Sequence, residues 1–178
     1  MNDIRILDKT FREMIPAEMI EKRIKEIALQ MNNDLKGREV VFIGILNGAF
    51  MFAADLLRNI EFSPRITFVK LASYVGTGSS GKVRELIGWN EDISNMTVVV
   101  VEDIVDTGQT LERIVDELNI RKVKEMRIAT LFLKTDVYSK QIELDYVGFE
   151  IPNNFIIGFG LDYNGYGRNF RSVYTLVS

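Results

Sequence analysis

The 178-residue chain contains no cysteine and no histidine. Without cysteine it can form no disulfide, offers no thiolate nucleophile and has no cysteine-ligated metal. Without histidine, catalytic triads and zinc sites that depend on imidazole are excluded. Any acid–base chemistry must therefore be carried out by carboxylates, lysines, tyrosines or water.

The chain also lacks a signal-peptide pattern, an internal repeat, a low-complexity linker and any apolar run near the ~18 residues of a membrane helix. We therefore expect a cytoplasmic protein with no membrane partner. The net charge of −3 gives no general basic field for nucleic acid. With 47% apolar residues, we expect one domain spanning residues 1–178 with a substantial core.

Apolar spacing predicts alternating strands and helices. After Pro16, apolar residues three and four apart predict a helix that ends near Gly37. Further strands are expected at 40–46, 66–72, 98–101, 127–133, 146–149 and 155–158, and helices at 50–57 and 111–118. This alternation predicts an α/β fold with a parallel central sheet flanked by helices. The C-terminal third has no helical pattern, and with the N-terminus it should form a small, irregular, partly antiparallel hood.

The most informative stretch runs from Val98 to Leu111. Four valines predict a strand buried on both faces, and Glu102 and Asp103 follow it. A tight turn, Asp106-Thr107-Gly108-Gln109-Thr110, then leads into a helix, so backbone N–H groups gather at the positive end of a helix dipole. This predicts a phosphate-binding turn. Acids beside it indicate sugar hydroxyls or a metal, because carboxylates alone would repel a phosphate.

Two other interpretations of this stretch remain open. It could be a purely structural strand and helix cap with solvated acids. Asp106-Thr107-Gly108 also has the form of the aspartic-protease triplet, but a helical pattern follows it and acids precede it.

A second glycine-rich segment has nearly the pattern of a nucleotide-binding loop. Residues 76–82 read Gly-Thr-Gly-Ser-Ser-Gly-Lys, but Val83 stands where Mg²⁺ binding requires serine or threonine. No long helix pattern follows. Small residues at 75–83 between two strands favour a lid that is mobile without ligand.

The 98–111 stretch closely resembles the ribose-phosphate motif of type I phosphoribosyltransferases in their purine-salvage form. The segment 158–164, followed by Tyr166-Gly167-Arg168, resembles the hypoxanthine(-guanine) branch rather than the orotate, adenine or uracil branches. The resemblance extends from about residue 43 to residue 177. It implies the type I phosphoribosyltransferase fold.

The resemblance implies roles for the acids and the turn. Asp106 would be the general base, and Glu102 and Asp103 would bind the ribose hydroxyls and Mg²⁺, with Asp162 near a second metal. The phosphoribosyl-binding set would be Glu102, Asp103, Asp106, Thr107, Gly108, Gln109 and Thr110.

The resemblance also implies a pyrophosphate site made by Leu46, Asn47 and Gly48, with a cis peptide bond, and by Arg168. Asn47 stands where many relatives carry lysine, which removes one positive charge. A plain Asn-Gly turn is the alternative from the residues alone.

For the purine, the resemblance implies that Lys134 donates to a 6-oxo group, that Phe155 stacks on the ring, and that Ile156 and Asp162 lie beside it. Ser73 and Tyr74 would form the base of the lid. From the residues alone, Lys134 could equally be solvated at a strand end, Ser73 and Tyr74 could be an ordinary edge-strand pair, and Phe155 and Ile156 could be core.

The reaction implied is Mg²⁺-dependent transfer of 5-phosphoribosyl from phosphoribosyl pyrophosphate to N9 of hypoxanthine, with guanine as a second substrate, in a homodimer or homotetramer. A xanthine-preferring relative stays open. So does a phosphoribosyltransferase-fold RNA-binding regulator, although no basic cluster extends beyond residues 121–124.

Overall fold

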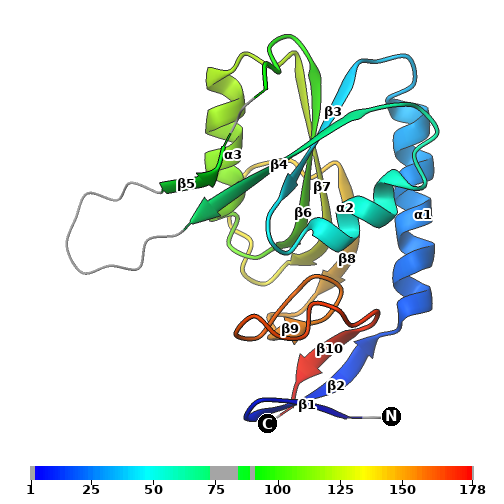
Figure 1. The fold of residues 1–178 in the computed structure, drawn as a ribbon, viewed down its shortest axis with the longest axis vertical. Helices are drawn as coiled ribbons and strands as arrows, with labels where there is room; N and C mark the ends of the chain where they lie inside the picture. Colours follow the sequence, from blue (N-terminus) through cyan, green and yellow to red (C-terminus); the bar gives the residue numbers. More distant parts are fainter. Residues whose placement is uncertain (1–2, 73–83, 89–90, 178) are drawn as a thin grey trace.

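The computed structural model describes residues 3–72, 84–88 and 91–177. A six-stranded sheet forms its centre, in the order β5-β4-β3-β6-β7-β8 (Figure 1). Strands β4, β3, β6, β7 and β8 are parallel, and β5 pairs antiparallel with β4 at the edge. The strand bounds are β3 Val40–Ile45, β4 Arg65–Ala72, β5 Arg84–Ile87, β6 Thr97–Val105, β7 Glu125–Lys134 and β8 Tyr146–Ile151.

Three helices cover the two faces of this sheet. They are α1 (Ala17–Asp34), α2 (Phe50–Leu57) and α3 (Gln109–Ile120). Val99 and Val101 of β6 pack in the cluster that contains the apolar faces of α1 and α2. Val98 and Val100 pack in the cluster that contains α3. Because side chains alternate along a strand, a run of valines is what a strand covered on both faces requires.

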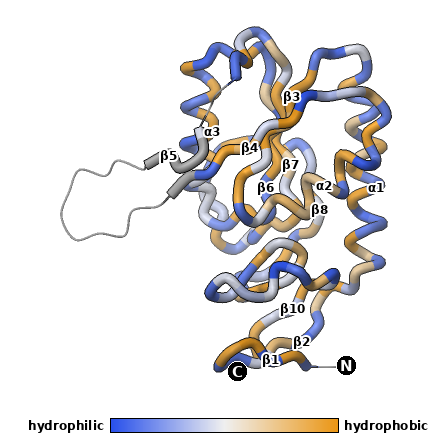
Figure 2. The backbone as a smooth tube through the Cα atoms, in the orientation of Figure 1, coloured by the Kyte–Doolittle hydropathy of each residue, from blue (hydrophilic) through white to orange (hydrophobic). Residues whose placement is uncertain are grey.

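Unlike β6, with its continuous apolar run, α1 is buried on one face only. Figure 2 shows α1 alternating between hydrophobic and hydrophilic residues along its length. Its buried residues, Ile20, Ile24, Ile27, Ala28 and Met31, recur at helical spacing. No helix in the described part of the chain is long and apolar enough to cross a membrane.

A second, antiparallel sheet of order β1-β2-β10-β9 lies beyond one end of the central sheet (Figure 1). It is built from β1 (Ile4–Ile6), β2 (Lys9–Ile15), β9 (Ile156–Ile157) and β10 (Val173–Leu176). We call residues 3–15 and 152–177 the hood. The α/β sheet and the hood confirm the expected fold, although the sequence pattern did not indicate β1, β2, β5 or β10.

One expected boundary is wrong in an informative way. The strand was expected to end before Glu102, but β6 continues to Val105 and both Glu102 and Asp103 are buried within it. The ladder with β7 supplies the reason, since Glu102 pairs with Thr130 and Val105 with Leu133. Backbone pairing therefore continues past the point where apolar composition stops.

We expect the stability of the fold to depend on the buried face of α1 and not on its outer face. Ile27→Ala should lower the free energy of unfolding by about 2–5 kcal/mol, because Ile27 is 1% exposed and its loss leaves a cavity. Leu29→Ala, two residues away and 61% exposed, should change it by less than about 0.5 kcal/mol. Urea unfolding of both variants tests this, and equal losses would contradict the assigned packing.

Candidate active site

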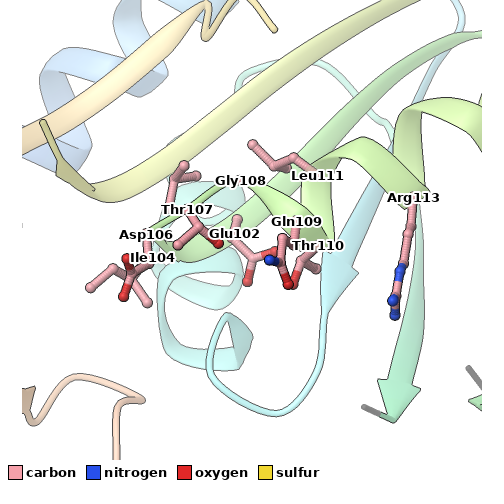
Figure 3. A pocket seen from close by; sticks show the side chains of 10 residues that line it. Glu102, Ile104, Asp106, Thr107, Gly108, Gln109, Thr110, Leu111 and Arg113 are labelled. Atoms are coloured by element: carbon pink, nitrogen blue, oxygen red, sulfur yellow. The ribbon is translucent and has the colours of Figure 1, made fainter. Parts of the chain in front are cut away.

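The turn between β6 and α3 leaves a helix start open to a ligand. Gly108 is the N-cap residue with φ 83°, and none of the described residues caps the helix with a side-chain hydrogen bond. A cavity of about 260 Å³ lies over this turn, lined by residues 102, 104–111 and 113. Figure 3 shows Glu102, Gln109 and Thr110 gathered together, with Arg113 extending from α3. Free N–H groups at a helix N-terminus suit an anion such as phosphate.

Gly108 is required at this turn for a second reason. A Cβ there would stand 2.7 Å from Lys140 Cγ and from Tyr138 Cε2. Lys140 donates to both Glu112 carboxylate oxygens, at 2.9 and 2.8 Å, which fixes this loop against α3. Glycine therefore permits both the left-handed backbone and the close approach.

Two buried carboxylates lie at the end of β6. Glu102 is 7% exposed and Asp103 is 8% exposed. Burial, and then the charge of Asp103, raise the pKa of Glu102 well above its ordinary value. Glu102 Oε2 has no hydrogen-bond partner among the described residues, whereas Asp103 Oδ1 accepts from the Ile104 N–H at 2.9 Å. An unpartnered buried carboxylate oxygen favours a cation or a hydroxyl ligand at this point.

The loop before α2 lies directly against Asp103. The Leu46–Asn47 peptide bond is cis. A Cβ on Gly48 would stand 1.5 Å from Asp103 Oδ2, and a Cβ on Gly160 would stand 2.1 Å from the Gly48 carbonyl oxygen. The loop is therefore held between the acid of β6 and the backbone of the hood.

A second cavity, of about 290 Å³, opens over this loop. The Arg168 guanidinium pairs with Asp162 at 2.5 Å and donates to the Gly160 carbonyl oxygen at 2.7 Å. The lining residues are Ile45, Leu46, Asn47, Gly48, Glu102, Asp103, Thr110, Arg113, Asp162 and Arg168. The cavity therefore brings together the expected pyrophosphate residues and the expected metal carboxylates.

These carboxylates do not form a ready metal cage. Among the described residues there is no group of three or more acids close enough to hold a metal ion. The expected set of Glu102, Asp103 and Asp162 therefore lines one cavity without converging on one point. Mg²⁺ does not require such a cage, because it commonly keeps waters and takes oxygens from a phosphate substrate.

Lys134, at the end of β7, faces Asp106. Its Nζ lies 3.3 Å from Asp106 Oδ2 and 3.2 Å from Asn153 Oδ1. The Lys134 side chain is 11% exposed and that of Asp106 is 50% exposed. The lysine is thus not simply solvated. The sequence patterns did not indicate Asn153, which lies 19 residues after Lys134 in the chain.

Phe155 and Ile156 differ in their surroundings. Ile156 is buried in the core, whereas Phe155 is 46% exposed. The Phe155 ring packs against Phe11, with centroids 6.3 Å apart, and edge-on against Tyr163 at 5.9 Å. Tyr163 is anchored by donating its hydroxyl to Asp8 at 2.9 Å. The arrangement presents a supported aromatic ring, and neither Tyr163 nor Asp8 was indicated by the sequence.

Ser73 and Tyr74, and the lid expected at residues 75–83, lie outside the described residues. Of the other expected site residues, Lys134, Phe155 and Ile156 line neither cavity, and the rest each line at least one of them.

The model of the family described as "Phosphoribosyl transferase domain" matches residues 13–164. A hypoxanthine-guanine phosphoribosyltransferase of Mycobacterium tuberculosis is 38% identical over 170 residues, covering 92% of this chain and 84% of that protein. One from Staphylococcus aureus is 38% identical over 164 residues, covering 92% of each. A crystal structure of a Staphylococcus aureus hypoxanthine phosphoribosyltransferase has a TM-score of 0.87 at 37% identity, covering 93% of this chain and 91% of that chain.

The chain therefore belongs to the phosphoribosyltransferase family and has the fold of its solved relatives. The three relatives named above are hypoxanthine(-guanine) phosphoribosyltransferases, and this chain is an enzyme of that transferase group.

We expect Gly160→Ala to impair phosphoribosyl transfer far more than Gly165→Ala. Both glycines have positive φ, 99° and 87°, so both substitutions carry a backbone cost. Only the Gly160 substitution meets the Gly48 carbonyl, since nothing lies within 4 Å of a Cβ at Gly165. A loop displaced by about 1 Å should cost roughly 10²-fold in rate.

Steady-state rates and thermal unfolding of each variant separate the loss of stability from the displacement of the loop of residues 46–48. Equal losses of activity at equal losses of stability would show that Gly160 does not position the loop.

Proposed function

We propose that this chain transfers the 5-phosphoribosyl group from phosphoribosyl pyrophosphate to N9 of hypoxanthine and guanine, releasing pyrophosphate. The observation that carries the proposal is the Lys134–Asp106 contact of 3.3 Å. It sets a cation and a carboxylate at the edge of the phosphate-binding turn. These two groups suit a purine with a 6-oxo acceptor and a ring proton to lose.

Within this mechanism, the turn from Asp106 to Thr110 holds the 5′-phosphate through backbone N–H groups and the two threonine hydroxyls. Glu102 and Asp103 bind the ribose hydroxyls. The loop from Leu46 to Gly48 and Arg168 hold the pyrophosphate, for which the planar guanidinium is suited.

The purine enters beside Phe155, which stacks on it, and Ile156 and Asp162 flank it. Lys134 donates to the 6-oxo oxygen, and Asp106 accepts the proton that the ring loses as the new bond forms. Adenine is disfavoured because its 6-amino group is itself a donor and offers the Lys134 ammonium no acceptor.

The chemistry of the site fits Mg²⁺ as the cofactor. Glu102 and Asp103 are hard oxygen ligands, one with a buried oxygen that has no partner, and Asp162 lines the same cavity. When bound, the ion would neutralise charge on the departing pyrophosphate. We further propose that the enzyme works as a homodimer or homotetramer in the cytoplasm.

Turnover of hypoxanthine, guanine, xanthine and adenine, each with phosphoribosyl pyrophosphate and Mg²⁺, tests the proposal. We expect the first two to react and adenine to be poor. Lys134→Ala should raise KM for hypoxanthine roughly 10- to 100-fold, the value of a hydrogen bond to a charged group, with little change in KM for phosphoribosyl pyrophosphate.

Lys124→Ala changes an exposed lysine just before the other end of β7, and as the control it should leave both constants unchanged. A parent enzyme that prefers xanthine would correct the substrate. If the chain turns over no base but binds RNA in a salt-dependent manner, the proposed transferase function is wrong.

Asp106→Asn tests the proton acceptor. The amide keeps the size of the side chain but is a poor base, so turnover should fall roughly 10²- to 10⁴-fold with both 6-oxopurines. Affinity for phosphoribosyl pyrophosphate should change little, because backbone groups hold its 5′-phosphate. Asp116→Asn, on the exposed side of α3, provides an equal change of charge away from the cavities. Turnover within about threefold of the parent would exclude Asp106 as the base.

A further inference from the structure

Arg113 has no role in the mechanism described above, yet it lines both cavities. It lies on α3, four residues after Gln109, in the second turn of that helix. Figure 3 shows its side chain extending from α3, apart from the group formed by Glu102, Gln109 and Thr110. Only Glu102 and Thr110 share this position between the two cavities.

The other cations of the site are already paired. Arg168 is held by Asp162 and the Gly160 carbonyl oxygen, and Lys134 by Asp106 and Asn153. Within the described residues, Arg113 makes no hydrogen bond and no ion pair. It is therefore the one basic side chain of the cavity over residues 46–48 whose donors are free for a ligand.

The charges around that cavity show why a free guanidinium matters there. Three carboxylates, Glu102, Asp103 and Asp162, line it against two guanidinium groups, of which one is paired. Asn47 contributes an uncharged amide. A polyphosphate entering this space meets a surplus of acid, so each additional cation that contacts it directly improves its binding.

We infer that Arg113 binds the diphosphate of the phosphoribosyl donor and the pyrophosphate product, and not the 5′-phosphate. The inference rests on the proposed function. The 5′-phosphate is already provided with backbone donors at the start of α3. Arg113 stands one turn further along and shares its second cavity with Asn47, Gly48 and Arg168, the residues that face the leaving group.

The two products separate the two phosphate positions, because inosine monophosphate carries only the 5′-phosphate and pyrophosphate only the leaving group. We would measure binding of each, with Mg²⁺, by calorimetry to the parent and to Arg113→Gln, Arg113→Lys and Arg58→Gln. Arg58 is an exposed arginine on the surface after α2, and its variant makes the same change in net charge outside both cavities.

Arg113→Gln should weaken pyrophosphate binding roughly tenfold, as expected for loss of a charge-assisted hydrogen bond, and leave inosine monophosphate binding unchanged. Arg113→Lys should restore part of the loss, and Arg58→Gln should match the parent. Weaker binding of inosine monophosphate alone would overturn the assignment to the diphosphate. Unchanged binding of both products would show that Arg113 is only solvated. A parent chain that binds neither product would instead overturn the proposed function.

Discussion

The burial of two adjacent carboxylates inside a strand is the constraint on which the site depends. Glu102 and Asp103 continue a strand whose preceding residues, 97–101, are all buried. Removing a charge from water costs several kcal/mol, so buried acids persist where a proton, a cation or hydrogen bonds compensate them. The raised pKa of Glu102 is one sign of this cost. Another is its Oε2, which has no hydrogen-bond partner in the described part of the chain and suits a cation or hydroxyl ligand.

The two acids at the end of β6 lie close together. Both line the cavity over residues 46–48, and the charge of Asp103 contributes to the raised pKa of Glu102. Glu102 also lines the cavity over the turn at residues 106–110, whereas Asp103 approaches Gly48 in the loop before α2. In the proposed function, a single strand end would thus serve both the ribose-phosphate side and the pyrophosphate side of one substrate.

The close approach at Asp103 is transmitted into the hood. Asp103 occupies the space that a side chain at position 48 would need, so this position favours glycine. The Gly48 carbonyl oxygen in turn occupies the space of a side chain at position 160, which also favours glycine. The hood segment that carries Gly160 also carries Asp162 and Arg168. The close packing of β6, the loop of residues 46–48 and the hood segment at Gly160 therefore places Asp162 and Arg168 over the ends of β3 and β6.

The sequence predicted those parts of the molecule that depend on local pattern. The valine run, the helical spacing of α1 and the turn at Gly108 each determine their own structure through side-chain alternation, periodicity or backbone freedom. The hood strands β1 and β10 are short, and β2 is largely exposed or half-buried, so the composition of these strands carries no such signal. Asn153, Tyr163 and Arg113 were missed for a related reason. Each looks like an ordinary polar surface residue until folding brings it beside Lys134, Phe155 or the two cavities.

The Lys134–Asp106 pair shows how the proposed site can be ordered and still open to a base. The lysine is almost covered, whereas the aspartate is half exposed, so solvent screens the attraction and the pair contributes little stability. In the proposed function, a purine that offers a carbonyl to the ammonium and a proton to the carboxylate would replace this contact with two directed hydrogen bonds. The Lys134 ammonium also lies 3.2 Å from Asn153 Oδ1, so it keeps one acceptor when its contact with Asp106 is broken. The weak ion pair would therefore orient both groups before the base binds, at a small free-energy cost to replace it.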